Sequence, residues 1–187
     1  MRLRLYVWAG TQLLLFAVLT TTGKAQGSER RVQLDQSAAV ERYNLGNALR
    51  HKGDLDGAIA EYRMAIHLNP NYADAHLNLG TALVIKNDLD GAIAEYRTAI
   101  RLDPNDAVAH KNLGNALDDK NDQDGAMAEY RTAIHLNPND ASAHFNFGCT
   151  LERNGNVEGA LAEYRKACSL SPENAAYCKL ARENRNR

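Results

Sequence analysis

An excess of charge of either sign is missing from this 187-residue sequence. Its 22 Lys and Arg side chains stand against 23 Asp and Glu, which gives a formal net charge of -1. Because nucleic-acid-binding proteins usually carry a basic face, we expect no nucleic-acid partner. Charged residues make up 24% of the chain, close to the usual quarter, so the composition does not favour wholesale disorder.

The motifs of common catalytic sites are missing too. The sequence has no glycine-rich phosphate loop, no Cys-x-x-Cys pair and no nucleophile elbow. Asp118 and Asp119 are adjacent carboxylates, but neighbours in a helix point about 100° apart and cannot face each other as an acid–base pair. We therefore interpret both as solvated charges, and we expect no enzymatic activity, no cofactor and no small-molecule substrate.

The N-terminal segment lacks charge between its first four residues, which include two arginines, and Lys24. Residues 5–19 are mostly apolar, and Gly23 and Ala25 are the small residues that a signal peptidase would read. We assign residues 1–25 to a signal peptide and expect an exported protein, periplasmic or secreted. The alternative is an uncleaved membrane anchor, which is marginal because a spanning helix needs about 20 mostly apolar residues.

The rest of the sequence is repetitive. The phrases "GAIAEYRMAI", "GAIAEYRTAI", "GAMAEYRTAI" and "GALAEYRKAC" begin 34 residues apart, the first at Gly57. A fixed period between 20 and 50 residues indicates a solenoid, a propeller or an array. The period divides the chain into a linker and start of the first helix (26–38), four units (39–72, 73–106, 107–140 and 141–174) and a capping helix with a tail (175–187).

Within each unit, apolar residues recur at spacings of three and four. In the second unit, Leu79 and Leu83 share one face of a first helix, and Tyr96 and Ile100 share one face of a second. This spacing is typical of amphipathic helices, and no segment shows the period of two that strands require. The pattern predicts an all-α fold, an α-solenoid (superhelix) of about four helix-turn-helix units.

Three sets of residues recur at fixed positions of the 34-residue unit. Two sets end helices, and the third lets the two helices of a unit pack closely. Gly and Asn tolerate the left-handed conformation that ends a helix, and the acidic or amide residue that follows can cap the next helix. Proline stops the second helix of each unit. A glycine inside the first helix costs roughly 1 kcal/mol against alanine, and we expect it to let the paired helix approach closely. The three sets are Gly53, Asn87, Asn121 and Gly155; Pro70, Pro104, Pro138 and Pro172; and Gly46, Gly80, Gly114 and Gly148.

These residues resemble the tetratricopeptide repeat, whose period is also 34. The resemblance is carried by the following positions of the second unit and their equivalents: Leu79, Gly80, Leu83, Ala92, Tyr96, Ala99 and Pro104. It covers residues 39–174 in full and 175–187 in part. One departure is visible, because the family often has an aromatic residue where this chain has Arg42, His76, His110 and His144.

The three histidines do not indicate a metal site. Packed helices lie about 8–10 Å apart, so equivalent positions in successive units are at least that distant. Zinc holds histidine nitrogens at about 2.0–2.1 Å. We therefore interpret His76, His110 and His144 as packing residues and expect no metal.

Comparison of the second and third units locates a variable stripe on the first helix. The two units differ, for example, at Leu77/Lys111 and Ile85/Asp119, on the side opposite the stacking face. The resemblance implies that this stripe lines the concave surface where extended peptides bind. We assign the following residues to a peptide-binding groove: Tyr43, Asn44, Asn47, Leu77, Asn78, Val84, Ile85, Lys111, Asn112, Asn115, Phe145 and Asn146.

Two features of the stripe bear on the ligand. Its apolar members indicate a ligand with apolar side chains, anchored near the first two units. Its asparagines at one shared offset (Asn44, Asn78, Asn112, Asn146) resemble the asparagine ladder of the protein O-GlcNAc transferase repeats, and an amide can pair with any peptide backbone. The alternative is that asparagine is simply common there in the family consensus.

Lys111, Asn115 and Asn146 also match the first half of the carboxylate clamp of chaperone-binding repeats. The second half would need basic residues at Ala176 and Leu180. Because neither residue is basic, we do not expect the groove to capture a C-terminal carboxylate.

Three cysteines are present, and an odd number leaves one unpaired. Cys168 and Cys178 flank Pro172 and can face each other across a helical hairpin, so we hypothesise a disulfide that fastens the end of the solenoid. The alternative is two small buried thiols. Cys149 lies on the groove stripe and is the expected free thiol.

The sequence therefore favours a non-enzymatic interaction module. We expect it to bind a protein or an extended peptide in the concave groove, as an adaptor or scaffold in an extracytoplasmic assembly. Any contact with a membrane would be through an uncleaved N-terminal segment. The alternative is a structural spacer or self-assembling repeat array that leaves the groove empty.

Overall fold

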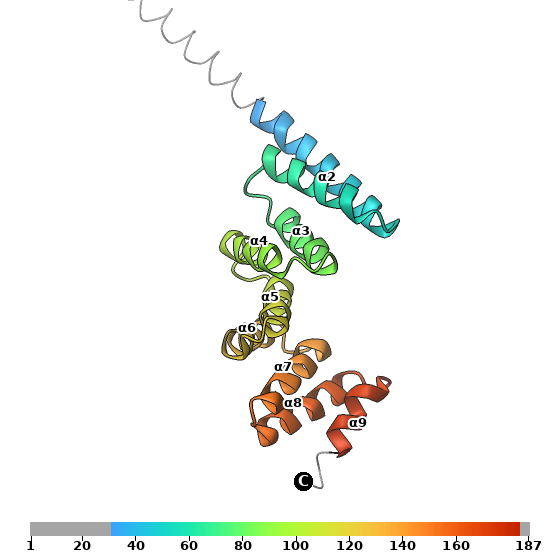
Figure 1. Ribbon diagram of the computed structural model, residues 1–187, viewed down its shortest axis with the longest axis vertical. Coiled ribbons are helices and arrows are strands. Elements are labelled where there is room, and N and C mark those ends of the chain that lie inside the picture. Colours follow the sequence, from blue (N-terminus) through green and yellow to red (C-terminus); the bar gives the residue numbers. More distant parts are fainter. Residues whose placement is uncertain (1–30, 184–187) are drawn as a thin grey trace, which may run out of the picture.

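The computed structural model describes residues 31–183, which form nine helices and no strand (Figure 1). The predicted all-α solenoid is confirmed. The helices follow one another as antiparallel pairs: residues 31–51 with α2 (Leu55–Leu68), α3 (Ala73–Ile85) with α4 (Leu89–Leu102), α5 (Ala107–Asp119) with α6 (Gln123–Leu136), and α7 (Ala141–Arg153) with α8 (Val157–Leu170), followed by α9 (Ala175–Glu183).

The signal-peptide assignment for residues 1–25 lies outside the described residues. Within residues 31–183, no helix combines the length and the apolar character that a membrane span needs. Helical structure is already present at residue 31, within the segment assigned to the linker and the start of the first helix.

The turns inside the units form as the sequence predicts. Asn87 and Asn121 have positive φ of 63° and 66°, the left-handed conformation that asparagine tolerates and that ends a helix. Asp88 then caps α4, because its Oδ1 accepts a hydrogen bond of 2.9 Å from the backbone N–H of Gly91. The same cap begins the second helix of every unit, from Asp54, Asp122 and Asn156.

One contact fixes the distance between the two helices of a unit. The ring of Tyr96 in α4 is buried against Gly80 in α3. A Cβ atom on Gly80 would lie 2.7 Å from Tyr96 Cε1 and 3.2 Å from the carbonyl oxygen of Ala92. Only a glycine leaves room for this ring, so the predicted close approach is confirmed. The contact recurs with Tyr62 on Gly46, Tyr130 on Gly114 and Tyr164 on Gly148.

The pairs stack along the long axis of the molecule, and the two ends of the stack differ (Figure 1). At the C-terminal end α9 packs on α8, and Cys168 and Cys178 are joined in a disulfide with their Cα atoms 4.7 Å apart. At the N-terminal end no unit of the described chain covers the first helix. Leu45 is consequently 44% exposed, whereas Leu79 at the same offset of the next unit is 2% exposed.

The first prediction tests the glycine contact. Alanine favours a helix by roughly 1 kcal/mol over glycine, but we expect Gly80→Ala to lower the free energy of unfolding by about 1–3 kcal/mol, because the added methyl group overpacks the Tyr96 ring. Urea unfolding of the purified protein measures the change. In a Tyr96→Leu background, which lacks the ring, the same replacement should cost less; an equal cost in both backgrounds would contradict this account.

Candidate functional site: the concave groove

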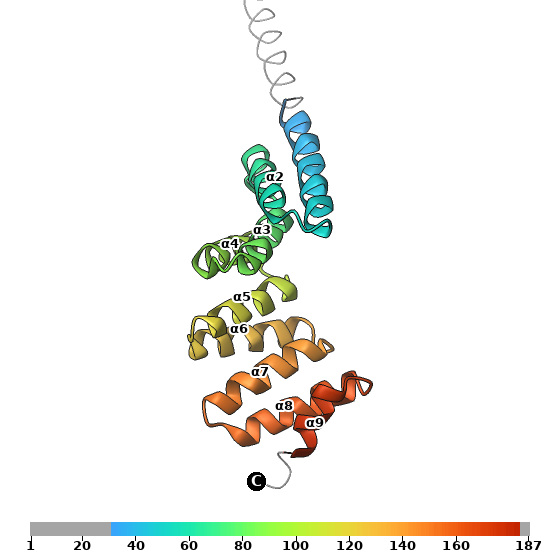
Figure 2. The same cartoon turned by 45° about the vertical axis from the view of Figure 1, so that its right-hand side comes forward.

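The first helices of the units form the inner row of the solenoid. Helix α3 contacts α5, and α5 contacts α7, in addition to the contacts within each pair (Figure 2). In a curved stack, the elements that approach each other most closely lie on the concave side. The first helices, which carry the variable stripe, therefore lie along this side.

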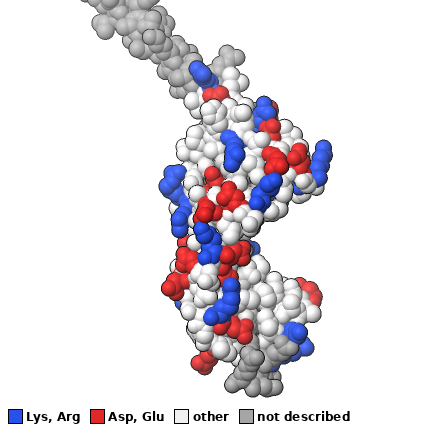
Figure 3. All heavy atoms as spheres, in the orientation of Figure 1, with Lys and Arg blue, Asp and Glu red and all other residues white. Residues whose placement is uncertain are grey.

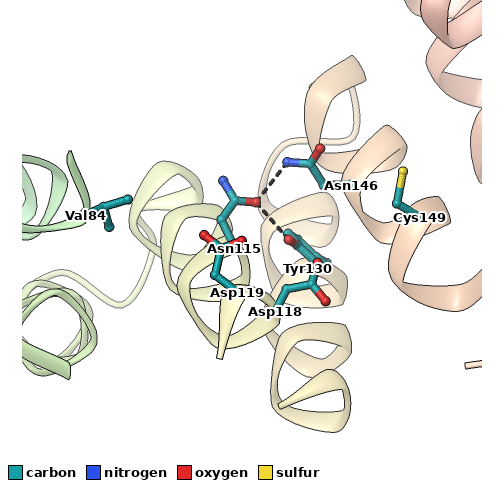
Figure 4. Close-up of a pocket in the computed structure, with 7 residues that line it drawn as sticks. All are labelled: Val84, Asn115, Asp118, Asp119, Tyr130, Asn146 and Cys149. Carbon is teal, nitrogen blue, oxygen red and sulfur yellow. Dashed lines mark hydrogen bonds between the residues drawn. The ribbon is translucent and has the colours of Figure 1, made fainter. Parts of the chain in front are cut away.

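Two adjoining pockets hollow the inner row. The larger, of about 340 Å³, is lined by residues of α3, α5, α6 and α7: Val84, Asn115, Asp118, Asp119, Tyr130, Asn146 and Cys149 (Figure 4). The smaller, of about 210 Å³, is lined by Thr81, Val84, Ile85, Tyr96, Asn112, Asn115 and Ala116. Because Val84 and Asn115 belong to both, the two pockets are neighbours along the groove.

A hydrogen-bonded chain joins the core to the groove. The hydroxyl of the buried Tyr130 donates to Asn115 Oδ1 at 2.8 Å, and Asn146 Nδ2 of the next unit donates to the same oxygen at 2.8 Å (Figure 4). The first two units repeat the pattern, since Tyr62 and Asn78 both donate to Asn47 Oδ1. These bonds hold the first helix of the second unit to that of the first unit, and the first helix of the fourth unit to that of the third.

The predicted row of asparagines is consequently divided into two kinds. The side-chain amides of Asn78 and Asn146 donate hydrogen bonds to asparagines of the preceding unit, Asn47 and Asn115. Asn78 also donates to the hydroxyl of Tyr43, at 2.9 Å. Asn44 and Asn112 form no side-chain hydrogen bond with residues 31–183, so their amides are available to a ligand. The sequence does not show this division, because all four residues are identical.

Another groove offset contacts residues at or near the start of the helix that follows each pair. The ring of Tyr43 lies 5.0 Å from that of Tyr72, and the ring of Phe145 lies 4.6 Å from that of Tyr177 in α9 (centroid distances). In the third unit this offset is Lys111, whose Nζ donates to Asp140 Oδ2 at 2.7 Å and to Ser142 Oγ at 2.9 Å. Leu77, the fourth member, is partly buried against the core.

The partner of Lys111 is itself a helix cap. Asp140 Oδ1 accepts hydrogen bonds from the backbone N–H groups of Ser142 and Ala143, at the start of α7. Partial burial acts to raise the pKa of Asp140, but the hydrogen bonds from Lys111 and Ser142 outweigh it and hold the pKa below the ordinary value of 3.8. The ion pair thereby ties the third unit to the first turn of the fourth.

The structure corrects the interpretation of Asp118 as a solvated charge. Its side chain is only 13% exposed, because a guanidinium nitrogen of Arg153, in the next unit, donates to Oδ2. Asp119 remains exposed and also lines the larger pocket. The variation at Val84/Asp118 and Ile85/Asp119 between units was the sequence signal that both aspartates belong to the groove.

Burial and charge shift the pKa values of two groups in the larger pocket. Burial raises the pKa of the Tyr130 phenol, and the nearby charges of Asp118 and Asp119 raise the pKa further. Burial likewise raises the pKa of the free Cys149 thiol in the same pocket, which favours the neutral thiol over the nucleophilic thiolate.

The histidines do not line these pockets, and each joins the two helices of its unit to the end of the preceding unit. His110 Nδ1 lies 2.6 Å from Glu129 Oε2 in α6, and Nε2 lies 3.3 Å from the carbonyl oxygen of Pro104. His76 and His144 make the equivalent contacts, and in the first unit Arg42 pairs with Glu61. Among residues 31–183, no group of three or more His, Cys, Asp and Glu side chains is placed to hold a metal ion.

The geometry defines an α-solenoid of helix pairs with an inner groove, and comparison with known proteins identifies its family. A family model described as TPR repeat matches residues 46–84, 80–119 and 114–155, and one described as tetratricopeptide repeat matches residues 141–174. The chain therefore belongs to the tetratricopeptide repeat family. Proteins with these repeats are generally non-enzymatic modules that bind proteins or peptides.

Solved structures share the fold. A crystal structure of MamA is 27% identical, with a TM-score of 0.71 over 76% of this chain and 83% of that chain. YrrB, described as a TPR protein with an unusual peptide-binding site, is 24% identical, with a TM-score of 0.70 over 84% and 81%. PilF of Pseudomonas aeruginosa is 21% identical, with a TM-score of 0.73 over 80% and 68%. No curated protein sequence matches the chain.

The division of the asparagines gives a second prediction. We expect Asn115→Ala to lower the free energy of unfolding by about 1–3 kcal/mol, because it leaves the Tyr130 hydroxyl and Asn146 without their shared acceptor. Asn112→Ala should change it by less than about 0.5 kcal/mol. Urea unfolding compares the two variants, and similar losses would contradict the division.

The third prediction concerns pH. Because the pKa of Asp140 is lower in the folded protein than its ordinary value, its contribution to stability is complete above about pH 3.8 and is lost as the pH falls through the folded-state pKa. We expect Lys111→Met to reduce this acid-range loss and to cost up to about 1 kcal/mol near neutral pH.

Urea unfolding at a series of pH values between about 2 and 7 measures both effects. Lys86→Met is the matched control, since it removes a lysine whose carboxylate partner, Asp56, is 81% exposed. An unchanged pH profile in Lys111→Met would show that Lys111 does not set the pKa of Asp140.

Proposed function

We propose that this protein is a non-enzymatic adaptor that binds an extended segment of a partner protein in its concave groove. The observation that carries the proposal is the pair of adjoining pockets on the inner row, lined by the free amide of Asn112 and by apolar Val84 and Ile85. Asn112 forms no side-chain hydrogen bond with residues 31–183 and Ile85 is exposed, whereas Val84 is partly buried against the core.

The chemistry of these groups suits an extended chain. An amide offers a donor and an acceptor, and an extended backbone presents both at regular intervals without regard to its side chains. Ile85 is 57% exposed, and such an exposed apolar residue in a hollow favours contact with an apolar side chain. Backbone pairing would supply affinity, and the apolar pocket would supply selectivity.

We place the adaptor in an extracytoplasmic assembly. The disulfide between Cys168 and Cys178 supports this proposal, because disulfides persist in oxidising compartments and are rare in the cytosol. The basic and then apolar pattern of residues 1–25 supports it as well. In the alternative, the same segment anchors the protein to the membrane.

A specific observation favours a second candidate, the self-assembling array. Leu45 and Ala48 of the first helix are exposed, although the residues at the same offsets of the next unit, Leu79 and Ala82, are buried against the preceding unit. A second solenoid could stack on this open face. The array would use the ends of the solenoid and leave the groove empty.

A capture experiment tests the adaptor function. The purified protein serves as bait for the exported fraction of its own organism, and the affinity of each captured partner is then measured with variants. We expect the double variant Ile85→Ser/Asn112→Ala to lose at least roughly tenfold in affinity, or about 1.4 kcal/mol. The matched control Asn105→Ala/Val157→Ser changes exposed residues outside the pockets and should bind normally.

Light scattering of the same variants separates the two candidates. The adaptor function is supported if the protein is a monomer and the groove substitutions weaken its affinity for a captured partner. Concentration-dependent oligomers that survive the groove substitutions, combined with unchanged affinity for every captured partner, would reject the groove as the binding site.

A further inference from the structure

Two groove positions of the first helix, here called the floor, change their charge from one unit to the next, while the buried tyrosine and glycine of each unit stay the same. Two adjacent offsets near the C-terminal end of each first helix supply this floor. They read Arg50–His51, Val84–Ile85, Asp118–Asp119 and Glu152–Arg153 in chain order. Each of these pairs belongs to a unit that has a buried tyrosine in its second helix packed on a glycine in its first helix. Constant packing with a changing charge at these offsets indicates that the units differ in the ligand groups they favour, although Asp118 and Arg153 also bind each other.

The carboxylates of Asp118 and Asp119 line the larger of the two pockets. Asp118 and Asp119 are the two charged residues among the seven that line the pocket of about 340 Å³, and the others are apolar or neutral (Figure 4). Asp118 Oδ1 is buried and accepts no hydrogen bond from residues 31–183. A buried carboxylate oxygen is stabilised by a hydrogen-bond donor, so the pocket favours a ligand group that carries one.

The charges around this pocket do not cancel. Arg153 pairs with Asp118, and the neighbouring Lys120 pairs with Asp90 outside the pocket. Asp119 forms no ion pair with the described residues and is exposed at the pocket. One negative charge is therefore uncompensated by the described residues. Elsewhere on the surface, basic and acidic side chains are interspersed, as the face in Figure 3 shows.

The acidic pocket has an apolar neighbour. Val84 lines both pockets, and Ile85 lines the smaller one. Packed helices lie about 8–10 Å apart, and an extended chain advances about 3.3 Å per residue. A ligand that crosses from the floor of the second unit to that of the third therefore covers about three residues.

From this arrangement we infer a recognition pattern, which rests on the proposed function and specifies its ligand. The groove binds an extended peptide segment that places an apolar side chain on Val84 and Ile85 and, about three residues away, a Lys or Arg side chain in the pocket of Asp118 and Asp119. The ammonium or guanidinium group donates hydrogen bonds to the carboxylates and neutralises the charge of Asp119. A peptide with an acidic side chain at that position is repelled.

Three synthetic peptides test the pattern. Each has ten residues, blocked ends, a Gly/Ser background, a leucine and, three positions later, a lysine, a norleucine or a glutamate. Fluorescence anisotropy should show the lysine peptide binding at least roughly fivefold more tightly than the norleucine peptide, and the glutamate peptide binding most weakly. The preference should shrink at high salt, because exposed charges are screened.

Protein variants assign the effect to Asp119. Asp119→Asn should remove most of the lysine preference, and Asp119→Lys should transfer it to the glutamate peptide. Asp124→Asn is the matched control, because Asp124 is also exposed and unpaired among the described residues, but it lies on α6 outside the pocket. Protection of Cys149, the single free thiol, from a maleimide reports that a peptide occupies the pocket.

The outcomes separate this inference from the proposed function. Equal binding of the three peptides, with protection of Cys149 and sensitivity to Ile85→Ser, overturns the charge pattern and leaves the groove as a peptide site. Preference for the glutamate peptide overturns it as well. If none of the three binds or protects Cys149, both the pattern and peptide binding in this groove are overturned.

Discussion

The contact between a buried tyrosine and a helical glycine is the interaction on which the rest of this structure depends. It sets the spacing of the two helices in each unit, since a Cβ atom at the glycine would overlap the ring. The same tyrosine carries its hydroxyl out of the core to the groove, where Tyr130 donates to Asn115 and Tyr62 donates to Asn47. One side chain therefore links the packing of the two helices in a unit to the position of an asparagine that faces the groove.

Within this constant frame, the groove residues divide into two kinds. The residues that share the offset of Tyr43, Lys111 and Phe145 hold successive helix pairs together, by ring contacts or by an ion pair. At the asparagine offset, Asn78 and Asn146 likewise bind the preceding unit, whereas Asn44 and Asn112 form no side-chain hydrogen bond with residues 31–183. In a solenoid each unit contacts only its neighbours, so stability is close to a sum of unit and interface contributions. A groove side chain that contacts the neighbouring unit therefore adds to the stability of the stack and is less available to a ligand.

Most of the fold could be predicted from the sequence, because its determinants are local and repeated. Helical periodicity, the left-handed residues at Asn87 and Asn121, the aspartate caps and the contact glycines all act within one unit. The groove could be located by the same periodicity. The role of each groove side chain could not be predicted, because its partner lies outside its own helix and far along the chain. Lys111 binds Asp140, the cap of the next unit's first helix, 29 residues later, and Asp118 binds Arg153, 35 residues later.

These long-range partners change how the groove can vary. Asn115 and Lys111 cannot be exchanged without loosening the stack, so they are poor candidates for encoding specificity even though they face the groove. Ile85, Asn112 and Asp119 have no such partner among the described residues, and Ile85 and Asp119 occupy the same offset, which is apolar in the second unit and acidic in the third. The ligand preference that we propose depends on positions where the solenoid has no structural use for the side chain. In this protein that condition is met on the floor between the second and third units.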